Sequence, residues 1–410
     1  MTRRPLAVAC LAATSLLAAA AVAAAGGDAR TAEPGVTATA ILIGGTASLS
    51  VPASAAVARG AAAYFQHVNA RGGVHGRTIR YRVVDDADDP AQTVEATRGL
   101  VEQEDVLAIF NSVGTEHNRA VRDYLNARGV PQLFVASGAR TFGADAAEFP
   151  YTIGFRPSYG AEGRVLGRFV ARTRPRATVA VIVEDGDDGR DLLAGFRRGI
   201  AGSGAAVVAV ERSEATAPAL RSRIAALEAS GADTLAIVAT PSLAARAYAV
   251  LRALAWRPFV LTSAVSSAAG VVRVASAGGS GGLAGGPVSV VFLKDPSERR
   301  WAEDRAIRLY RTIMRRYARG ANVRDVHHVY GMAAAYTLVE VLRKAGRNPS
   351  RAAVMRQVRA LAVASNPFLL PGVAVRTGPG DGFPIEQMQL QRWERGRWRA
   401  FGGLWEPRGG

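Results

Sequence analysis

The chain has 410 residues, 51 of them lysine or arginine and 34 aspartate or glutamate, which gives a formal net charge of +17. Cys10 is its only cysteine, so a disulfide within the chain and a cysteine-based metal site are excluded. A basic chain raises the alternative of nucleic acid or anionic membrane binding, but the arginines are scattered through predicted helices and the chain carries an export signal. The length suffices for two domains.

The first 26 residues have the parts of a signal peptide. Arg3 and Arg4 form a charged region, residues 6–25 are apolar and rich in alanine, and small residues precede a cleavage site near Ala25. We therefore expect an exported protein, periplasmic or secreted. A membrane anchor is the alternative, because the run approaches the roughly 20 residues that span a bilayer. A lipid anchor at Cys10 is less supported, and whether the segment is cleaved stays open.

Short apolar strands then alternate with amphipathic helices, a pattern typical of parallel sheets covered by helices on both faces. Gly72 and Gly73 end one helix, since glycine supplies the left-handed cap, and Pro90 opens the next. The predicted strands are 40–45, 79–84, 106–110, 131–135 and 151–155, and the predicted helices are 53–69, 90–102 and 115–128. The last of these strands is expected to lead into a second lobe.

The pattern repeats in the next part of the chain. Strands are predicted at 178–183, 206–211, 234–239 and 259–262, and helices at 159–173, 190–202, 218–230 and 243–254. A glycine- and serine-rich linker at 275–286 precedes a strand at 287–292, which is expected to return the chain to the first lobe. Helices at 296–318, 326–345 and 350–361 follow, and alternating residues predict a hairpin of 387–393 with 398–404.

The segment 69–97 carries a family resemblance. Its sequence has Asn69 followed by Gly72-Gly73-Val74 and then Asp85-Asp86. This pattern resembles that of solute-binding proteins of branched-chain amino acid ABC transporters, which have the type I periplasmic binding protein fold. The resemblance implies two doubly wound α/β lobes with parallel sheets, joined by three crossings, with ligand held between them. The expected bounds are 36–154 plus 286–385 for lobe 1, and 155–285 plus 386–406 for lobe 2.

Ligands of open parallel sheets sit beyond the carboxyl ends of the strands. In lobe 1 these positions are small-residue loops that enter helix N-termini, where unpaired N–H groups and the helix dipole bind a carboxylate. The resemblance implies that two of these loops hold the carboxylate and amino group of the ligand. Helix capping is the alternative role for the hydroxyls. The candidates are Thr46, Ser48, Ser112, Gly114, Thr115, Ser137, Gly138 and Ala139.

In lobe 2 the chain departs from the family pattern. The acid that relatives use to hold an ammonium group falls at Ala264, and two aromatic positions fall near Asp188 and Thr240. Since a buried ammonium needs a charged partner, we expect a small organic carboxylate, and an aromatic one in particular, unless Asp187 or Asp188 replaces that acid. Capping of the next helix is the alternative role for these two aspartates. The candidates are Tyr159, Asp187, Asp188, Thr240, Ser263 and Ala264. Tyr330 is expected in the core, and a place in the wall of the site is the alternative for it.

The sequence carries no motif for nucleotide binding, nucleophilic catalysis or metal binding. There is no phosphate-binding glycine loop, no nucleophile elbow and no paired metal spacing among the five histidines. We expect no enzyme, no cofactor and no metal, and a monomer that closes on its ligand by a hinge. The resemblance implies an ABC permease and ATPase as partners. The alternative is an exported sensor domain of the same fold; a repressor of this fold would begin with a DNA-binding helix-turn-helix instead of an export signal.

Overall fold

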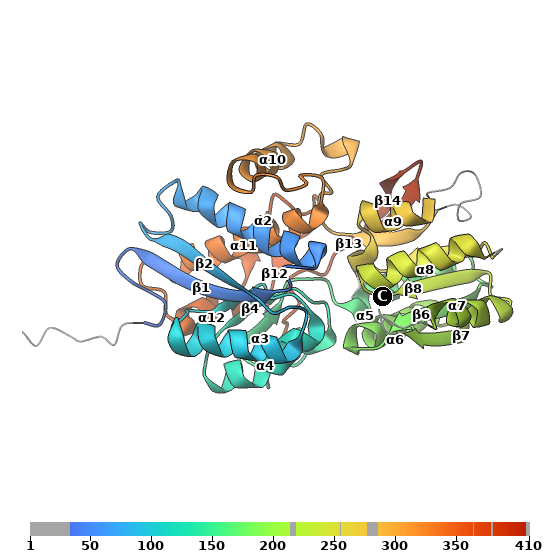
Figure 1. Cartoon of the computed structure of the whole chain (residues 1–410), viewed down its shortest axis with the longest axis horizontal. Coiled ribbons are helices and arrows are strands. Elements are labelled where there is room, and N and C mark those ends of the chain that lie inside the picture. Colours follow the sequence, from blue (N-terminus) through green and yellow to red (C-terminus); the bar gives the residue numbers. More distant parts are fainter. Residues whose placement is uncertain are drawn as a thin grey trace, which may run out of the picture.

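The computed structural model describes residues 33–213, 219–254, 256–276, 286–363, 365–378 and 380–406. The chain forms two α/β lobes that lie side by side along its longest axis (Figure 1). The predicted signal peptide and most of the predicted glycine-rich linker lie outside these residues. Within them, no helix has the length and apolar character that a bilayer crossing requires. The predicted class of two lobes with parallel-dominated sheets is confirmed.

The first lobe has an all-parallel sheet in the order β2-β1-β3-β4-β5. Its strands are β1 (Ala40–Ala47), β2 (Thr78–Asp85), β3 (Ile109–Phe110), β4 (Gln132–Val135) and β5 (Thr152–Gly154). Its helices are α2 (Pro52–Asn69), α3 (Pro90–Arg98), α4 (Thr115–Ala127), α10 (Arg305–Tyr317), α11 (Val326–Ala345) and α12 (Arg351–Arg359), with short turns η1 (Gly99–Gln103) and η2 (Arg140–Phe142).

Alternation along β1 divides the first lobe's core between the two faces of its sheet. Ile41 and Ile43 pack with residues of α2 and α11, while Leu42 joins the cluster that contains residues of η1 and α4. Figure 1 shows α2 and α11 on one side of this sheet and α3 and α4 on the other. Both faces are thus covered by helices, as expected for a parallel sheet.

The second lobe has a seven-stranded sheet in the order β14-β13-β10-β9-β8-β6-β7, in which only β13 runs antiparallel to its neighbours. Its strands are β6 (Thr178–Glu184), β7 (Ala206–Ser213), β8 (Thr234–Val238), β9 (Phe259–Thr262), β10 (Val288–Val291), β13 (Met388–Glu394) and β14 (Arg397–Trp405). Its helices are α5 (Tyr159–Thr173), α6 (Asp187–Ile200), α7 (Leu220–Ala229), α8 (Pro241–Ala253) and α9 (Ala269–Ser276).

One predicted strand belongs to the other sheet. Residues 287–292 were expected to return the chain to lobe 1, but β10 pairs in parallel with β9 and antiparallel with β13, and so lies in the sheet of lobe 2. The chain passes to lobe 2 after β5, back after β10, and returns before β13. The predicted hairpin is confirmed as β13 and β14, whereas α9 and the two-residue pair β11 (Ala362–Val363) and β12 (Val375–Arg376) were not predicted.

The segment that carries the family resemblance is an anchor between α2 and β2. The Asn69 side chain accepts a hydrogen bond from the Ile79 N–H at 2.7 Å and donates one to the Ile79 carbonyl at 2.8 Å. Gly73 has φ +70°, and a Cβ atom there would lie 1.9 Å from the Arg77 carbonyl oxygen. Asparagine and glycine at these positions therefore hold the tight turn that sets β2 beside β1.

Replacing Asn69 by alanine tests this anchor. Asn69→Ala removes two part-buried hydrogen bonds, and we expect the free energy of unfolding to fall by about 2 kcal/mol, since each such bond contributes about 1 kcal/mol. Urea unfolding followed by circular dichroism measures it. The control is Gln66→Ala on the exposed side of the same helix, which should change stability by less than about 0.5 kcal/mol. Equal losses for the two variants would contradict the anchoring role.

Candidate ligand-binding site

Hydrogen bonds link the residues predicted at the strand ends of lobe 1. Ser112 Oγ accepts a hydrogen bond from the Thr46 N–H at 2.9 Å, and Thr115 Oγ1 lies 2.7 Å from Ser137 Oγ. Ser137 Oγ also accepts from the Ala139 N–H at 3.1 Å. Ser48 pairs with Ser50 at 3.2 Å. The loops after β1, β3 and β4 therefore form one continuous surface, as the parallel order requires.

Helix α4 begins on this surface without a side-chain cap. Its N-cap residue, Gly114, has φ +106°, a conformation that favours glycine, and it has no side chain that could accept a hydrogen bond from the first-turn N–H groups. Those N–H groups have no partner within the helix either. With the Thr115 and Ser137 hydroxyls beside it, the start of α4 offers several hydrogen-bond donors and a partial positive charge to an anion.

Lobe 2 contributes the strand ends opposite. Glu184, at the end of β6, accepts a hydrogen bond from the Thr240 hydroxyl at 3.1 Å and from the Thr240 N–H at 2.5 Å. Glu162, on α5, accepts from the Ala264 N–H at 2.7 Å. The acid missing from position 264 is therefore supplied next to it by another helix, which the sequence pattern alone does not reveal. Ser263 is buried beside Ala264.

Helices α5 and α6 are held together by backbone-to-backbone packing. A Cβ atom at Gly163 would lie 2.0 Å from the Leu192 carbonyl oxygen, and one at Gly195 would lie 2.1 Å from the Gly160 carbonyl oxygen. This contact fixes the start of α6 relative to Tyr159. The Tyr159 N–H in turn donates to the Gly138 carbonyl of lobe 1 at 2.8 Å.

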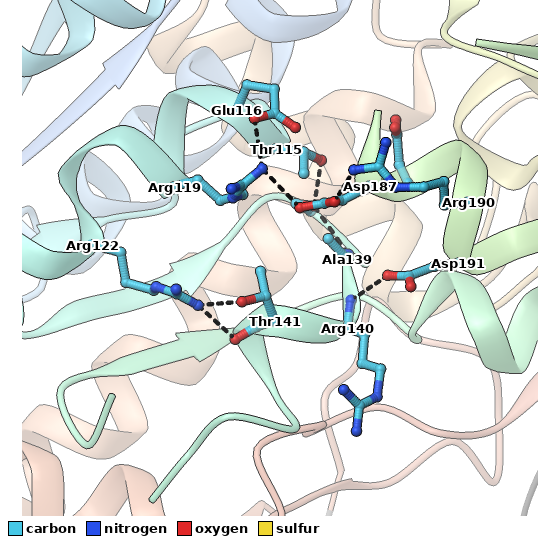
Figure 2. Close-up of polar contacts among 12 residues, drawn as sticks. Thr115, Glu116, Arg119, Arg122, Ala139, Arg140, Thr141, Asp187, Arg190 and Asp191 are labelled. Carbon is cyan, nitrogen blue, oxygen red and sulfur yellow. Dashed lines mark hydrogen bonds and ion pairs between the residues drawn. The ribbon is translucent and has the colours of Figure 1, made fainter. Parts of the chain in front are cut away.

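Two acidic side chains of α6 make polar contacts with lobe 1 (Figure 2). Arg119 of α4 lies 3.0 Å from a carboxylate oxygen of Glu116 in its own helix and 3.0 Å from one of Asp187 in α6. Asp187 also pairs with Arg190 one turn further along α6. The Arg140 N–H donates to Asp191 at 2.7 Å. Asp187 and Asp191 are one turn apart, so one face of α6 meets lobe 1.

The lobes leave little space beside the segments that follow β5 and β10, where the chain crosses from one lobe to the other. A hollow of about 40 Å³ lies there, lined on its two sides by Arg156, Ala264 and Tyr330 among others. Pockets for organic ligands usually measure about 300–1,000 Å³. This hollow is therefore too small to hold an organic ligand in the arrangement that the structure describes.

Carboxylates from both lobes face each other across this interface. Burial raises the pKa of Glu184, and the negative charges of Asp188 and Asp88 raise it further. Burial also raises the pKa of Asp188, with Glu116 and Asp187 adding to the shift, although the Gly189 N–H lowers it. Burial raises the pKa of Glu162 to about 7, against the opposing effects of the Ala264 N–H and the Arg156 charge. Burial thus opposes ionisation at all three acids, most strongly at Glu162.

The predicted residues fall into three groups. Those of lobe 1 come together, while Asp187 and Asp188 are engaged locally, Asp187 by two arginines and Asp188 by the Gly189 N–H at 2.9 Å. Tyr330 is buried against Phe155 and Phe292, as expected for a core residue, and it also lines the small hollow. Sequence reasoning missed Glu116, Arg119, Glu162, Glu184 and Asp191; only the one-turn spacings of 115 with 119 and 187 with 191 gave any signal.

No group of three or more histidine, cysteine or acidic side chains suited to a metal ion occurs in the part of the chain that the structure describes. The acids of the interface are partnered by arginines and backbone N–H groups instead. What the arrangement offers is recognition: an anion-binding helix start on one side and hydrogen-bonding acids and hydroxyls on the other.

The sequence of the chain matches one protein family, and its structure is similar to solved structures of one fold. The profile of a family described as periplasmic binding protein matches residues 40–397. The fold is similar to that of a branched-chain amino acid ABC transporter from Thermus thermophilus with bound valine, at 19% identity and a TM-score of 0.76, covering 90% of this chain and 96% of that one. No curated protein matches the chain.

Two further solved structures bind or are named for other solutes. A fatty acid ABC transporter substrate-binding protein from Thermomonospora curvata is 19% identical with a TM-score of 0.75, covering 92% of this chain and 94% of that one. A solute-binding protein from Rhodopseudomonas palustris BisB5 in complex with 3,4-dihydroxybenzoic acid is 16% identical with a TM-score of 0.71, covering 89% and 97%. At these identities the likeness shows the fold. Family and neighbours are binding proteins, not enzymes.

Removing the arginine between the lobes should favour their separation. The Arg119–Asp187 pair is part-exposed, and a pair of this kind contributes up to about 1 kcal/mol, so we expect Arg119→Ala to raise the open-to-closed ratio by up to about fivefold. Fluorescent labels on Glu95→Cys and Arg221→Cys, both exposed and one in each lobe, would report the distance. Arg128→Ala, which breaks a pair with Glu102 inside lobe 1, is the control. Identical distances in the two variants would contradict an interlobe role.

Glu162 should make stability depend on pH. Because its folded-state pKa is raised from 4.5 to about 7, the folded chain binds this proton more tightly than the unfolded chain. Its contribution is therefore fully favourable below pH 4.5 and is lost as pH rises to about 7, by up to about 3 kcal/mol. Urea unfolding at pH 5 and pH 8 should show that Glu162→Gln, which keeps the acceptor for Ala264, reduces this fall.

The matched control for this pH effect is Glu148→Gln, at an exposed glutamate of lobe 1. This variant should keep the pH dependence of the unmodified chain. A fall in stability between pH 5 and pH 8 that is equally steep in both variants would show that Glu162 does not titrate as its burial predicts.

Proposed function

The chain belongs to the periplasmic binding protein family, and from this premise we propose that it captures a small organic solute between its two lobes, outside the cytoplasm, and delivers it to an ABC importer. The importer's permease and ATPase would recognise the closed, loaded form. The predicted export signal supports this location, and the family neighbours from ABC transporters support this partner.

The observation that carries the proposal is the uncapped start of α4. Its first-turn N–H groups, with the Thr115 and Ser137 hydroxyls, face the first turn of α6 at the point where Arg119 joins the lobes. An anionic group bound there would contact lobe 1 first. Closure would then add contacts from lobe 2 that the open form lacks, and this differential contact is what drives a hinge.

The ligand class that we propose is a small carboxylate. Valine, 3,4-dihydroxybenzoic acid and fatty acids, the solutes named for three proteins of this fold, differ in size and polarity but share a carboxyl group. A carboxylate accepts hydrogen bonds from a helix start without a basic side chain. The uncapped start of α4 in lobe 1 is therefore complementary to the carboxyl group that these solutes share.

Glu162 decides between α-amino acids and other carboxylates. An α-amino acid would need a charged partner for its ammonium group, and Glu162 accepts a hydrogen bond from the N–H of Ala264, the position where the resemblance places that partner. In this chain Glu162 is fully buried, bonded to the Ala264 N–H and inclined to keep its proton. A protonated carboxyl is a poor partner for an ammonium group, so a carboxylate without an amino group, and an aromatic one in particular, is favoured.

Calorimetric titration tests the proposed function. Protein purified from the exported fraction, unfolded and refolded to remove bound solute, should bind benzoate or 3,4-dihydroxybenzoate at least tenfold more tightly than leucine or valine. Benzamide should bind at least tenfold more weakly than benzoate, because charge-assisted hydrogen bonds contribute about 1.5–3 kcal/mol. Leucine binding in the low micromolar range would overturn the ligand class, and no binding of any acid would overturn the carboxylate site.

Substitutions at the start of α4 test where the ligand binds, and an ATPase assay tests whether the protein serves an importer. Thr115→Val with Ser137→Ala should weaken binding at least tenfold, whereas Thr312→Ala, on an exposed part of α10, should leave it unchanged. Loaded protein added to membranes that contain the cognate permease and ATPase should raise ATP hydrolysis. Binding without this stimulation would favour the alternative of an exported ligand-sensing domain.

A further inference from the structure

Positive charge is concentrated on the outer side of lobe 1. Residues 299–324 contain nine arginines and two acidic residues, so this segment carries +7 of the net charge of +17. Its central element is α10, which has five arginines and no acidic residue. Figure 1 shows α10 outside α2, on the side of the sheet opposite to α4. The fold thus gathers on one surface arginines that are scattered along the sequence.

The outward face of α10 is a stripe of exposed arginines. We call it the α10 arginine surface, and it consists of Arg305, Arg308, Arg315, Arg316 and, just beyond the helix, Arg319. The four within the helix recur at spacings that return to one helix face, over roughly 16 Å along its axis. The opposite face, with Tyr310, Ile313 and Met314, is buried in the core of lobe 1. The core therefore holds this surface in place.

The acidic residues of the segment do not neutralise this surface. Glu303 pairs with Arg308 at 3.1 Å, and Asp304 pairs with Lys294 at 2.8 Å. Within the described residues, no ion pair joins a carboxylate to any other arginine of the surface. Four of its five guanidinium groups are thus available to an external anion.

The positive charge extends to the neighbouring helix α2. Burial lowers the pKa of His67 on α2, and the charges of Arg71 and Arg316 lower it further. Arg71 follows α2 and is exposed, as Arg316 is. Like charges held this close oppose folding, and an anionic partner would offset their repulsion.

The single sign of the charge favours a layer of lipid headgroups over a protein partner. A protein interface pairs charges of both signs at fixed positions, whereas the α10 arginine surface presents cations alone. Phospholipid headgroups carry phosphate groups, which guanidinium groups bind through two parallel hydrogen bonds. Mobile headgroups can also adjust to the spacing of the arginines, so no matching pattern is required of them.

Apolar and aromatic side chains accompany the arginines. Leu309 lies on the same face of α10 and is 36% exposed. Trp301 and Tyr317, both half-buried, flank the helix, and each ring is covered by an adjacent arginine at 4.5 Å and 5.2 Å from its centre. Tryptophan and tyrosine favour the boundary between lipid and water, because one end of each side chain is apolar and the other polar. This combination suits a headgroup layer.

We propose that the α10 arginine surface binds the protein to a membrane that carries anionic phospholipids. Guanidinium groups contact the phosphates, and Leu309, Trp301 and Tyr317 lie at the level of the headgroups. This binding goes beyond the capture of a solute and does not depend on it, because α4 starts on the other side of the sheet from α10. It would keep the protein close to the membrane between encounters with an importer.

Sedimentation with vesicles tests the proposal. Protein from the exported fraction should bind vesicles of equal parts phosphatidylcholine and phosphatidylglycerol at least tenfold more tightly than vesicles of phosphatidylcholine alone. Arg305→Gln, Arg315→Gln and Arg316→Gln together should weaken binding to the anionic vesicles at least tenfold. Raising the salt concentration from about 0.1 M to about 1 M, which shortens the Debye length from about 10 Å to about 3 Å, should do the same. Equal binding to the two kinds of vesicle would overturn the proposal.

A matched control removes the same charge elsewhere. Arg176→Gln, Arg197→Gln and Arg221→Gln change three exposed arginines of lobe 2, and this variant should bind anionic vesicles as the unmodified chain does. Equal weakening by the two triple variants would show that binding follows net charge and not the α10 arginine surface.

A dye that reports its surroundings keeps the test valid if the first triple variant does not fold. Attached at Thr312→Cys, exposed on the same face of α10, it should shift its emission to shorter wavelength when anionic vesicles are added. The same dye at Arg221→Cys in lobe 2 should not respond. A response at Arg221→Cys alone would place the contact elsewhere and contradict the proposal.

Polyglutamate distinguishes an acidic protein partner from a lipid surface. Binding of polyglutamate that the α10 triple variant abolishes, together with no binding of anionic vesicles, would assign the surface to an acidic protein and overturn the lipid proposal. Calorimetric titration with benzoate should give the same affinity for the α10 triple variant and the unmodified chain. Loss of vesicle binding and loss of solute binding are therefore separate results, and each leaves the other proposal standing.

Discussion

The parallel order of both sheets is the constraint on which the interlobe surface depends. Parallel strands end at one edge, and the helix that follows each strand begins there, with N–H groups that lack partners in the helix. In lobe 1 this edge carries Thr46, Ser112 and Ser137, and in lobe 2 it carries Glu184 and Thr240. Once the two edges face each other, small polar residues and helix starts meet without any need for a dedicated catalytic or basic motif.

The close contact of α5 with α6 turns these edges into one surface. Glycines at 163 and 195 let the two backbones approach to distances that any Cβ atom would prevent. The start of α6, with Asp187 and Asp191, is thereby fixed against the start of α5, with Tyr159 and Glu162. Because Phe169 of α5 also packs against Phe401 of β14, one helix connects the interlobe surface to the hairpin at the edge of the sheet.

Sequence reasoning located what periodicity and strand ends determine. Thr115 and Ser137 could be predicted because each follows a buried strand, and the turn after Asn69 could be predicted from its glycines. The pairing of Arg119 with Asp187 and the reach of Glu162 to Ala264 could not, since they depend on how two lobes separated in sequence are oriented. The sheet of β10 was also beyond reach, because a short strand buried on both faces carries no sign of which neighbours it joins.

Charge raises the remaining physical question, since an interface rich in acids is here proposed to receive an anion. Burial raises the pKa of Glu162, Glu184 and Asp188, so each of them gives up its proton less readily than an exposed acid does. Each proton that is retained removes one charge that would repel the approaching carboxylate. Arg119 neutralises part of what is left at Glu116 and Asp187. A net charge of +17 over the chain attracts an anion from a distance. The long-range field therefore favours the approach of the solute, and the nearby acids determine its orientation in the site.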